Sequence, residues 1–146
     1  MAALEEPLVN TVEEQLRRAT GDVVGVGASF AVVGGLAVSA RAEPRLTRDA
    51  DLAIAVRNDD EAERIVLAMQ ARGYSVLAVV EQNATGRLST VRLGSAGSVV
   101  MDLLFASSGI EPEIVERATD VSVIPGLVLP VASVGDLIAM KLSCPR

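Results

Sequence analysis

The sequence predicts a single α+β domain, with a mixed β-sheet and helices packed on it. Strand-like apolar segments alternate with helical segments in the first half of the chain, and hairpin-like strand segments follow in the second half. Half of the 146 residues are apolar but only 2% are aromatic, so we expect an aliphatic core. Residues 1–146 should therefore form one domain, which is either truncated at its C-terminal helix or completed there by a partner.

The first two expected elements are a helix and a buried strand. Thr11 and Glu14 have the spacing of a capping box, which predicts a helix that begins after Thr11 and ends at Gly21. The apolar run over 29–33 predicts a buried strand, because it is short and bounded by glycine.

A glycine pair separates this strand from the next helix. Gly34 and Gly35 break the strand, and a short helix is expected over 36–43 because Pro44 cannot continue it. Residues 49–56 then form a mainly apolar run, which predicts a second strand.

The middle of the chain predicts a long helix followed by two strands. Asn58 is expected to cap the helix and Gly73 to end it, with the apolar side chains on one face. β-Branched residues predict strands over 74–80 and 87–93, and a Gly/Ser turn is expected over 94–98.

Three local signals organise the remaining residues. Pro112 should begin a helix, Pro125-Gly126 should form the turn of a hairpin, and Ser133 should cap the last helix. In order, the expected elements are a strand over 99–105, a helix over 111–118, strands over 121–124 and 127–130, and a helix over 134–142.

The composition excludes several kinds of chemistry. The chain contains no histidine, which rules out imidazole bases, Ser-His triads and His-ligated zinc. Its single cysteine, Cys144, cannot form an internal disulfide, and this fits a reducing, cytoplasmic location. No apolar run reaches the roughly 18 residues of a membrane helix. The acidic N-terminal segment also lacks the basic start of a secretory signal.

The most informative feature is a pair of aspartates on the strand expected over 49–56. Asp49 and Asp51 are two residues apart, so both side chains should leave the same face of the strand. Two neighbouring carboxylates repel each other unless a positive group compensates. A divalent cation such as Mg²⁺ or Mn²⁺ is the natural candidate.

A third carboxylate and a glycine pair complete the pattern. Asp102 interrupts the apolar strand expected over 99–105, and it would join Asp49 and Asp51 if the two strands are neighbours. Such a cluster binds one or two Mg²⁺ ions and suits in-line attack on a nucleoside triphosphate. The glycines at 34–35 would let the backbone approach a polyphosphate closely.

Three segments of the chain resemble the nucleotidyltransferase superfamily, which has the DNA polymerase β-like fold. They are residues 30–41, 45–52 and 100–104, and the resemblance covers residues 10–142. The closest likeness is to the abortive-infection type IV toxins of toxin–antitoxin systems, which have an Arg-x-Thr-x-Asp-x-Asp run after a Gly-Gly helix start. That run matches Arg45, Thr47, Asp49 and Asp51.

The resemblance implies roles for individual residues. Asp49, Asp51 and Asp102 would hold the metal, with Asp102 as base or ligand. Nucleotide contacts would come from Gly34, Gly35, Ser39, Arg45 and Lys141. Arg41 is a further candidate for phosphate contact. In the family, further helices follow the helix that corresponds to residues 134–142 and carries Lys141. This chain departs from that pattern because it ends after this helix, so one wall of the pocket would be missing.

Three functions agree with these residues. The resemblance implies a metal-dependent transferase that moves a nucleoside monophosphate from an NTP to RNA, such as the 3′ end of tRNA, with an antitoxin protein as a partner. The net charge of −6 instead fits a cationic antibiotic as the acceptor. The third function is a catalytically silent domain that binds a nucleotide or a protein.

Overall fold

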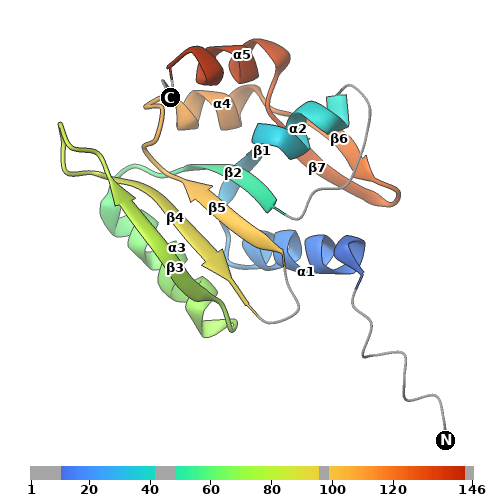
Figure 1. Ribbon diagram of the computed structural model, residues 1–146, viewed down its shortest axis with the longest axis horizontal. Coiled ribbons are helices and arrows are strands. Elements are labelled where there is room, and N and C mark those ends of the chain that lie inside the picture. Colours follow the sequence, from blue (N-terminus) through green and yellow to red (C-terminus); the bar gives the residue numbers. More distant parts are fainter. Residues whose placement is uncertain (1–10, 42–48, 96–98, 144–146) are drawn as a thin grey trace, which may run out of the picture.

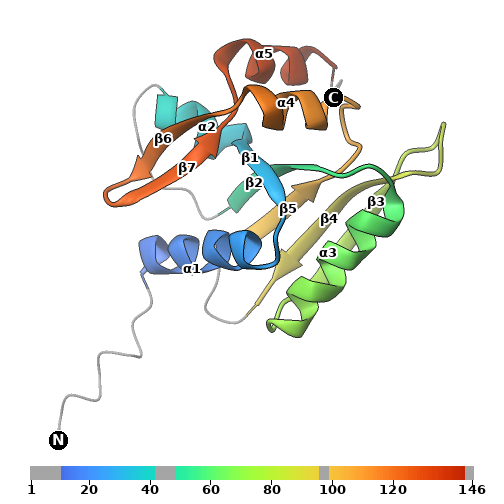
Figure 2. The same cartoon turned by 180° about the vertical axis from the view of Figure 1, so that it is seen from behind.

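The computed structural model of the protein describes residues 11–41, 49–95 and 99–143. In these residues a seven-stranded sheet lies between helices (Figures 1 and 2). The strands are β1 (Ser29–Val33), β2 (Asp49–Ala55), β3 (Ser75–Glu81), β4 (Leu88–Gly94), β5 (Val100–Leu104), β6 (Thr119–Ile124) and β7 (Leu127–Val131). The helices are α1 (Val12–Gly25), α2 (Gly34–Arg41), α3 (Asp59–Ala71), α4 (Glu111–Arg117) and α5 (Val134–Ser143).

The sheet is mixed, as the sequence predicts. Its strand order is β3-β4-β5-β2-β1-β7-β6. β2 runs antiparallel to β1 and parallel to β5, and β1 runs parallel to β7. The pairs β3–β4, β4–β5 and β6–β7 are antiparallel. The two strands that carry the aspartates, β2 and β5, are therefore direct neighbours in the middle of the sheet.

The two faces of the sheet belong to different apolar clusters. Leu52 and Ile54 of β2 are fully buried in the larger cluster, which includes residues of α1 and α3. Ala53, which points the other way along the same strand, is buried in a smaller cluster with Ile114 of α4, and α5 packs against its rim. The face with α4 and α5 is also the one toward which Asp49 and Asp51 point, because they share the parity of Ala53.

Most expected elements agree with the structure to within one or two residues. The helix caps at Thr11 and Asn58 form as predicted, and Ser133 accepts a hydrogen bond from the Asp136 backbone at the start of α5. The prediction that the first helix ends at Gly21 is wrong, because α1 continues to Gly25. Gly21 is exposed, and the buried residue Val23 anchors the last turn. The expected end of α2 at residue 43 lies outside the described residues.

No helix in the described part of the chain has the length and apolar character needed to cross a membrane.

Candidate active site

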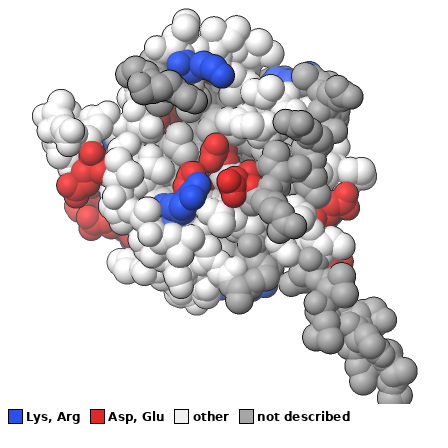
Figure 3. All heavy atoms as spheres, viewed as in Figure 1, with Lys and Arg blue, Asp and Glu red and all other residues white. Residues whose placement is uncertain are grey.

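Strand register places the acidic residues and one arginine in a row across the sheet. Asp51 of β2 pairs with Asp102 of β5, and Asp102 pairs with Arg92 of β4. Directly paired residues on neighbouring strands share a face, so the three side chains lie side by side. Asp49, two residues before Asp51, projects from the same face. We call these four residues the acid row; Figure 3 shows acidic side chains gathered beside a basic one near the middle of this face.

Gly34 lies directly against the acid row. Val33, the residue before it, pairs with Asp51, and this brings the first turn of α2 next to the Asp51 carboxylate. Gly34 has φ of +69°, a conformation that side chains other than glycine rarely adopt. A Cβ atom at this position would lie 2.3 Å from Oδ2 of Asp51. Both backbone conformation and space therefore require glycine here, which explains the first residue of the glycine pair.

The acid row is electrostatically strained. Burial raises the pKa of Asp51 above its ordinary value of 3.8 to about 6, and the nearby charge of Asp102 adds to this. A hydrogen bond between the two carboxyl groups and the charge of Asp49 also raise this pKa, while Arg92 opposes the change. The site thus favours an added positive charge.

Arg92 is the acid row's own positive group, and the sequence did not reveal it. Its Nε donates to Oδ1 of Asp102 at 3.0 Å and its Nη2 donates to Oδ2 at 3.2 Å, a two-pronged ion pair. Arg92 does not belong to any of the sequence motifs. Its role depends on the antiparallel register of β4 and β5, which a single sequence does not specify.

The predicted phosphate-contacting residues line one open groove beside the acid row. Gly34, Gly35 and Ser39 come from α2, and Lys141 lies opposite them on α5. Val38, Leu137 and Met140 complete the lining of this cavity of about 410 Å³. We call it the α2–α5 groove. The structure thus brings together four of the five predicted nucleotide contacts, and the fifth, Arg45, lies outside the described residues.

Two other arginines near the aspartates in sequence are engaged elsewhere. Arg41 donates through Nε to the Ala132 carbonyl at 2.7 Å and through Nη2 to the Val131 carbonyl at 2.9 Å, so it ties α2 to the end of β7. Arg57 pairs with Glu61 at the start of α3. The expectation that Arg41 contacts phosphate is therefore not supported by its position, since its guanidinium is occupied by main-chain carbonyls.

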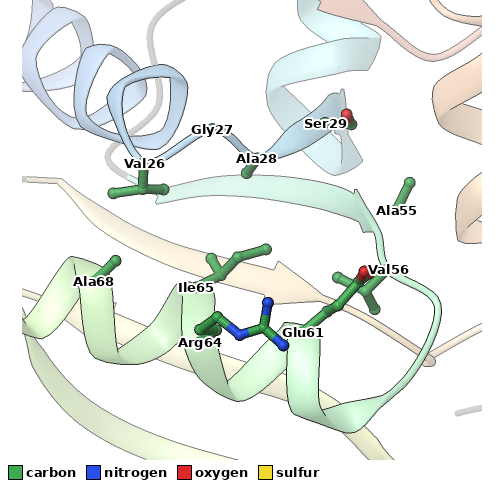
Figure 4. Close-up of a pocket in the computed structure, with 10 residues that line it drawn as sticks. All are labelled: Val26, Gly27, Ala28, Ser29, Ala55, Val56, Glu61, Arg64, Ile65 and Ala68. Carbon is green, nitrogen blue, oxygen red and sulfur yellow. The ribbon is translucent and has the colours of Figure 1, made fainter.

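A second cavity lies at the other end of β1 and β2. It has a volume of about 460 Å³ and is lined by the start of β1, the end of β2 and one side of α3 (Figure 4). Figure 4 shows Ile65 pointing from α3 toward the segment 26–28. Its acidic residue, Glu61, is already paired with Arg57. The chemistry of the acid row is absent from this cavity, so we place the candidate active site at the acid row and the α2–α5 groove.

The acid row suits a hard divalent cation. Carboxylate oxygens are the ligands that Mg²⁺ and Mn²⁺ prefer, and the pKa of Asp51 is raised by burial and, to a smaller extent, by the neighbouring charges of Asp102 and Asp49. In the described residues, however, no three acidic or cysteine side chains are already gathered closely enough to enclose an ion. Asp102 is turned toward Arg92 instead. The donor set therefore fits such an ion, and its side chains would have to close around it.

Comparison with known proteins identifies a family and a shared fold. A family model described as nucleotidyl transferase AbiEii toxin, type IV TA system, matches residues 20–144. No curated protein matches the chain in sequence. The crystal structure of the lincosamide antibiotic adenylyltransferase LnuA with bound lincomycin matches at a TM-score of 0.59 with 13% identity, covering 89% of this chain and 85% of LnuA. At this identity the match shows a common fold.

JHP933 from Helicobacter pylori is a more distant match. The TM-score is 0.43 at 16% identity, and the alignment covers 96% of this chain but 58% of JHP933. The chain thus spans well under two thirds of that protein.

Proposed function

The chain belongs to the family of nucleotidyltransferase AbiEii toxins of type IV toxin–antitoxin systems, and we propose that it transfers a nucleoside monophosphate from an NTP to a hydroxyl of RNA. The 3′ end of tRNA is the acceptor that we propose, and an antitoxin protein is the proposed partner in the cell.

One observation carries the proposal. Asp51 and Asp102 are paired on adjacent strands, and Asp51 abuts a glycine turn that opens into the α2–α5 groove. Carboxylates placed together at the mouth of a groove with a glycine-bounded helix start suit a polyphosphate and its cation. A structural ion pair between Arg92 and Asp102 alone would not explain why Asp49 and Asp51 project from the same face beside it.

The protein's own groups have distinct tasks in the proposed reaction. Asp49, Asp51 and Asp102 would hold Mg²⁺, which when bound neutralises charge on the polyphosphate and lowers the pKa of a hydroxyl. Gly34 allows the α2 backbone to approach the phosphates, and Lys141 supplies positive charge from across the groove. The acceptor oxygen forms a bond to the α-phosphorus, the bond from that phosphorus to the β-phosphate oxygen breaks, and pyrophosphate leaves. Asp102 receives the hydroxyl proton.

The test is transfer of label from each of the four α-³²P-labelled NTPs, in the presence of Mg²⁺, to total RNA. The wild-type protein should label RNA of tRNA size, and Asp51→Asn should not. Asp60→Asn is the matched control, because it makes the same chemical change at an exposed position on α3. Equal labelling by wild type and Asp51→Asn would refute the assignment of this site.

A small-molecule acceptor is the second candidate. The net charge of −6 suits a cationic antibiotic, and LnuA, which has the same fold, is an antibiotic adenylyltransferase. The same labelled NTPs incubated with aminoglycosides and with lincomycin separate the two acceptors, since label on RNA alone rejects this candidate. Calorimetric binding of Mg²⁺ and NTP without transfer to either acceptor would indicate a catalytically silent domain.

A further inference from the structure

We propose that Arg92 competes with the divalent cation for Asp102, so that it is a positioning residue that must release this carboxylate before the acid row can close around an ion. This inference rests on the proposed function, because it concerns the cation of the same site. It adds a residue that the sequence motifs do not contain.

The guanidinium of Arg92 engages the whole carboxylate of Asp102. Both oxygens of the Asp102 carboxylate accept a hydrogen bond from the guanidinium, at 3.0 and 3.2 Å. A planar guanidinium that bonds both oxygens occupies the side of the carboxylate to which an ion would bind. This explains why Asp102 is close to Asp51 and yet the described residues hold no ready-made three-ligand site.

Arg92 can leave Asp102 at low cost. Its side chain is 44% exposed, and solvent-accessible ion pairs are weak because water and salt screen them. A divalent ion that attracts three carboxylates at once interacts more strongly with them than one guanidinium does. Arg92 therefore acts as a weakly bound competitor of the ion. In the metal-free protein its charge offsets part of the repulsion between the carboxylates. When the ion is present, Arg92 lowers the affinity of the site for it.

A supporting role for Arg92 would predict the opposite change in metal affinity when the arginine is removed. If Arg92 served to hold Asp102 in the correct orientation for the ion, removal of the arginine would weaken metal binding. If Arg92 competes, its removal strengthens metal binding, although the fold loses a cross-strand ion pair. The sign of the change in metal affinity thus separates competition from support.

The experiment measures Mn²⁺ binding to the full chain by electron paramagnetic resonance, with MnCl₂ and no nucleotide. Arg92→Gln should bind Mn²⁺ about three- to tenfold more tightly than wild type, since a competitor and a repelling charge are both removed. Arg92→Lys, which keeps the charge but lacks the planar fork that forms two parallel hydrogen bonds, should lie between the two. Arg87→Gln is the matched control, because Arg87 is 42% exposed and pairs with Asp59 instead; it should bind as wild type does.

Each outcome has one meaning. Equal or weaker Mn²⁺ binding by Arg92→Gln, with wild-type binding that Asp51→Asn abolishes, overturns the competition and leaves the proposed function intact. The same gain in Arg87→Gln would also overturn it, because the effect would then be general electrostatics. Absence of any binding that depends on Asp51 would refute the metal site itself, and with it the proposed function. Melting curves of Arg92→Gln and Arg92→Lys verify that both variants are folded.

Discussion

The carboxylate of Asp51 should destabilise the metal-free protein at neutral pH, and Asp51→Asn should therefore stabilise it. The pKa of Asp51 rises from an ordinary 3.8 to about 6 in the folded chain. A difference of this size corresponds to about 3 kcal/mol of unfolding free energy. Because Asp51 is partly exposed, solvent screening reduces this, and we expect about 1 to 2 kcal/mol.

The direction of the pH dependence follows from proton uptake. Between pH 4 and about 6 the folded protein retains a proton on Asp51 that the unfolded chain has lost. The contribution of this proton to stability is complete below pH 4 and is lost as the pH rises through 6. The asparagine side chain of the variant cannot ionise, so the variant should gain on wild type across this window and keep a constant advantage above it.

Urea unfolding in the presence of EDTA at pH 4, 6 and 8, followed by circular dichroism, measures this difference. At pH 8 the midpoint for Asp51→Asn should exceed that of wild type by about 0.5 to 1 M urea, and the midpoints should converge at pH 4. Comparison of the two proteins cancels the titration of groups that they share. A difference that is absent at pH 8, or the same at every pH, would refute the reasoning.

Three further predictions concern other residues of the site and its support. Gly34→Ala should lower the unfolding free energy by about 2 kcal/mol, because a positive φ strains alanine and the added Cβ meets the Asp51 carboxylate. Thermal melting measures this loss. An unchanged melting temperature would contradict the close approach of Gly34 to Asp51. Asp49→Ala should reduce nucleotidyl transfer at least about a hundredfold while the melting temperature stays the same or rises slightly; gross unfolding would mark Asp49 as a structural residue. Arg41→Ala should lower the unfolding free energy by about 2 kcal/mol, because the guanidinium of Arg41 bonds the carbonyls of Val131 and Ala132. Arg41→Lys should not restore this stability. A wild-type melting temperature for Arg41→Ala would show that these hydrogen bonds do not hold α2 in place.

Local signals predicted most elements, because their causes are local. The capping box at Thr11, the cap at Asn58 and the Pro125-Gly126 turn each act within a few residues, and the structure contains all three. The end of α1 lies four residues beyond the predicted position because its cause is not local. Gly21 disfavours helix locally, but burial of Val23 against the sheet outweighs a cost of about 1 kcal/mol.

The sequence predicts the part of the candidate site that lies on a single strand. Asp49 and Asp51 share a face by the period of a strand, which needs no knowledge of neighbours. The sequence predicts that Asp102 joins this pair only if β2 and β5 are neighbours. That pairing joins residues about fifty positions apart, so local patterns do not specify it. The role of Arg92 cannot be predicted from the sequence, because its partner is set by the register of β4 on β5. Pairing between distant segments depends on the packing of the whole domain.

We expect the acid row to hold a divalent cation beside Gly34. Diffraction at the manganese absorption edge, from crystals of the wild-type protein with Mn²⁺ and a non-hydrolysable NTP, would locate this ion. We predict an anomalous peak within bonding distance of Asp51 and Asp102, with the triphosphate against the first turn of α2. Manganese and nucleotide found elsewhere, for instance in the cavity beside Ile65, with Asp102 still bonded to Arg92, would contradict it.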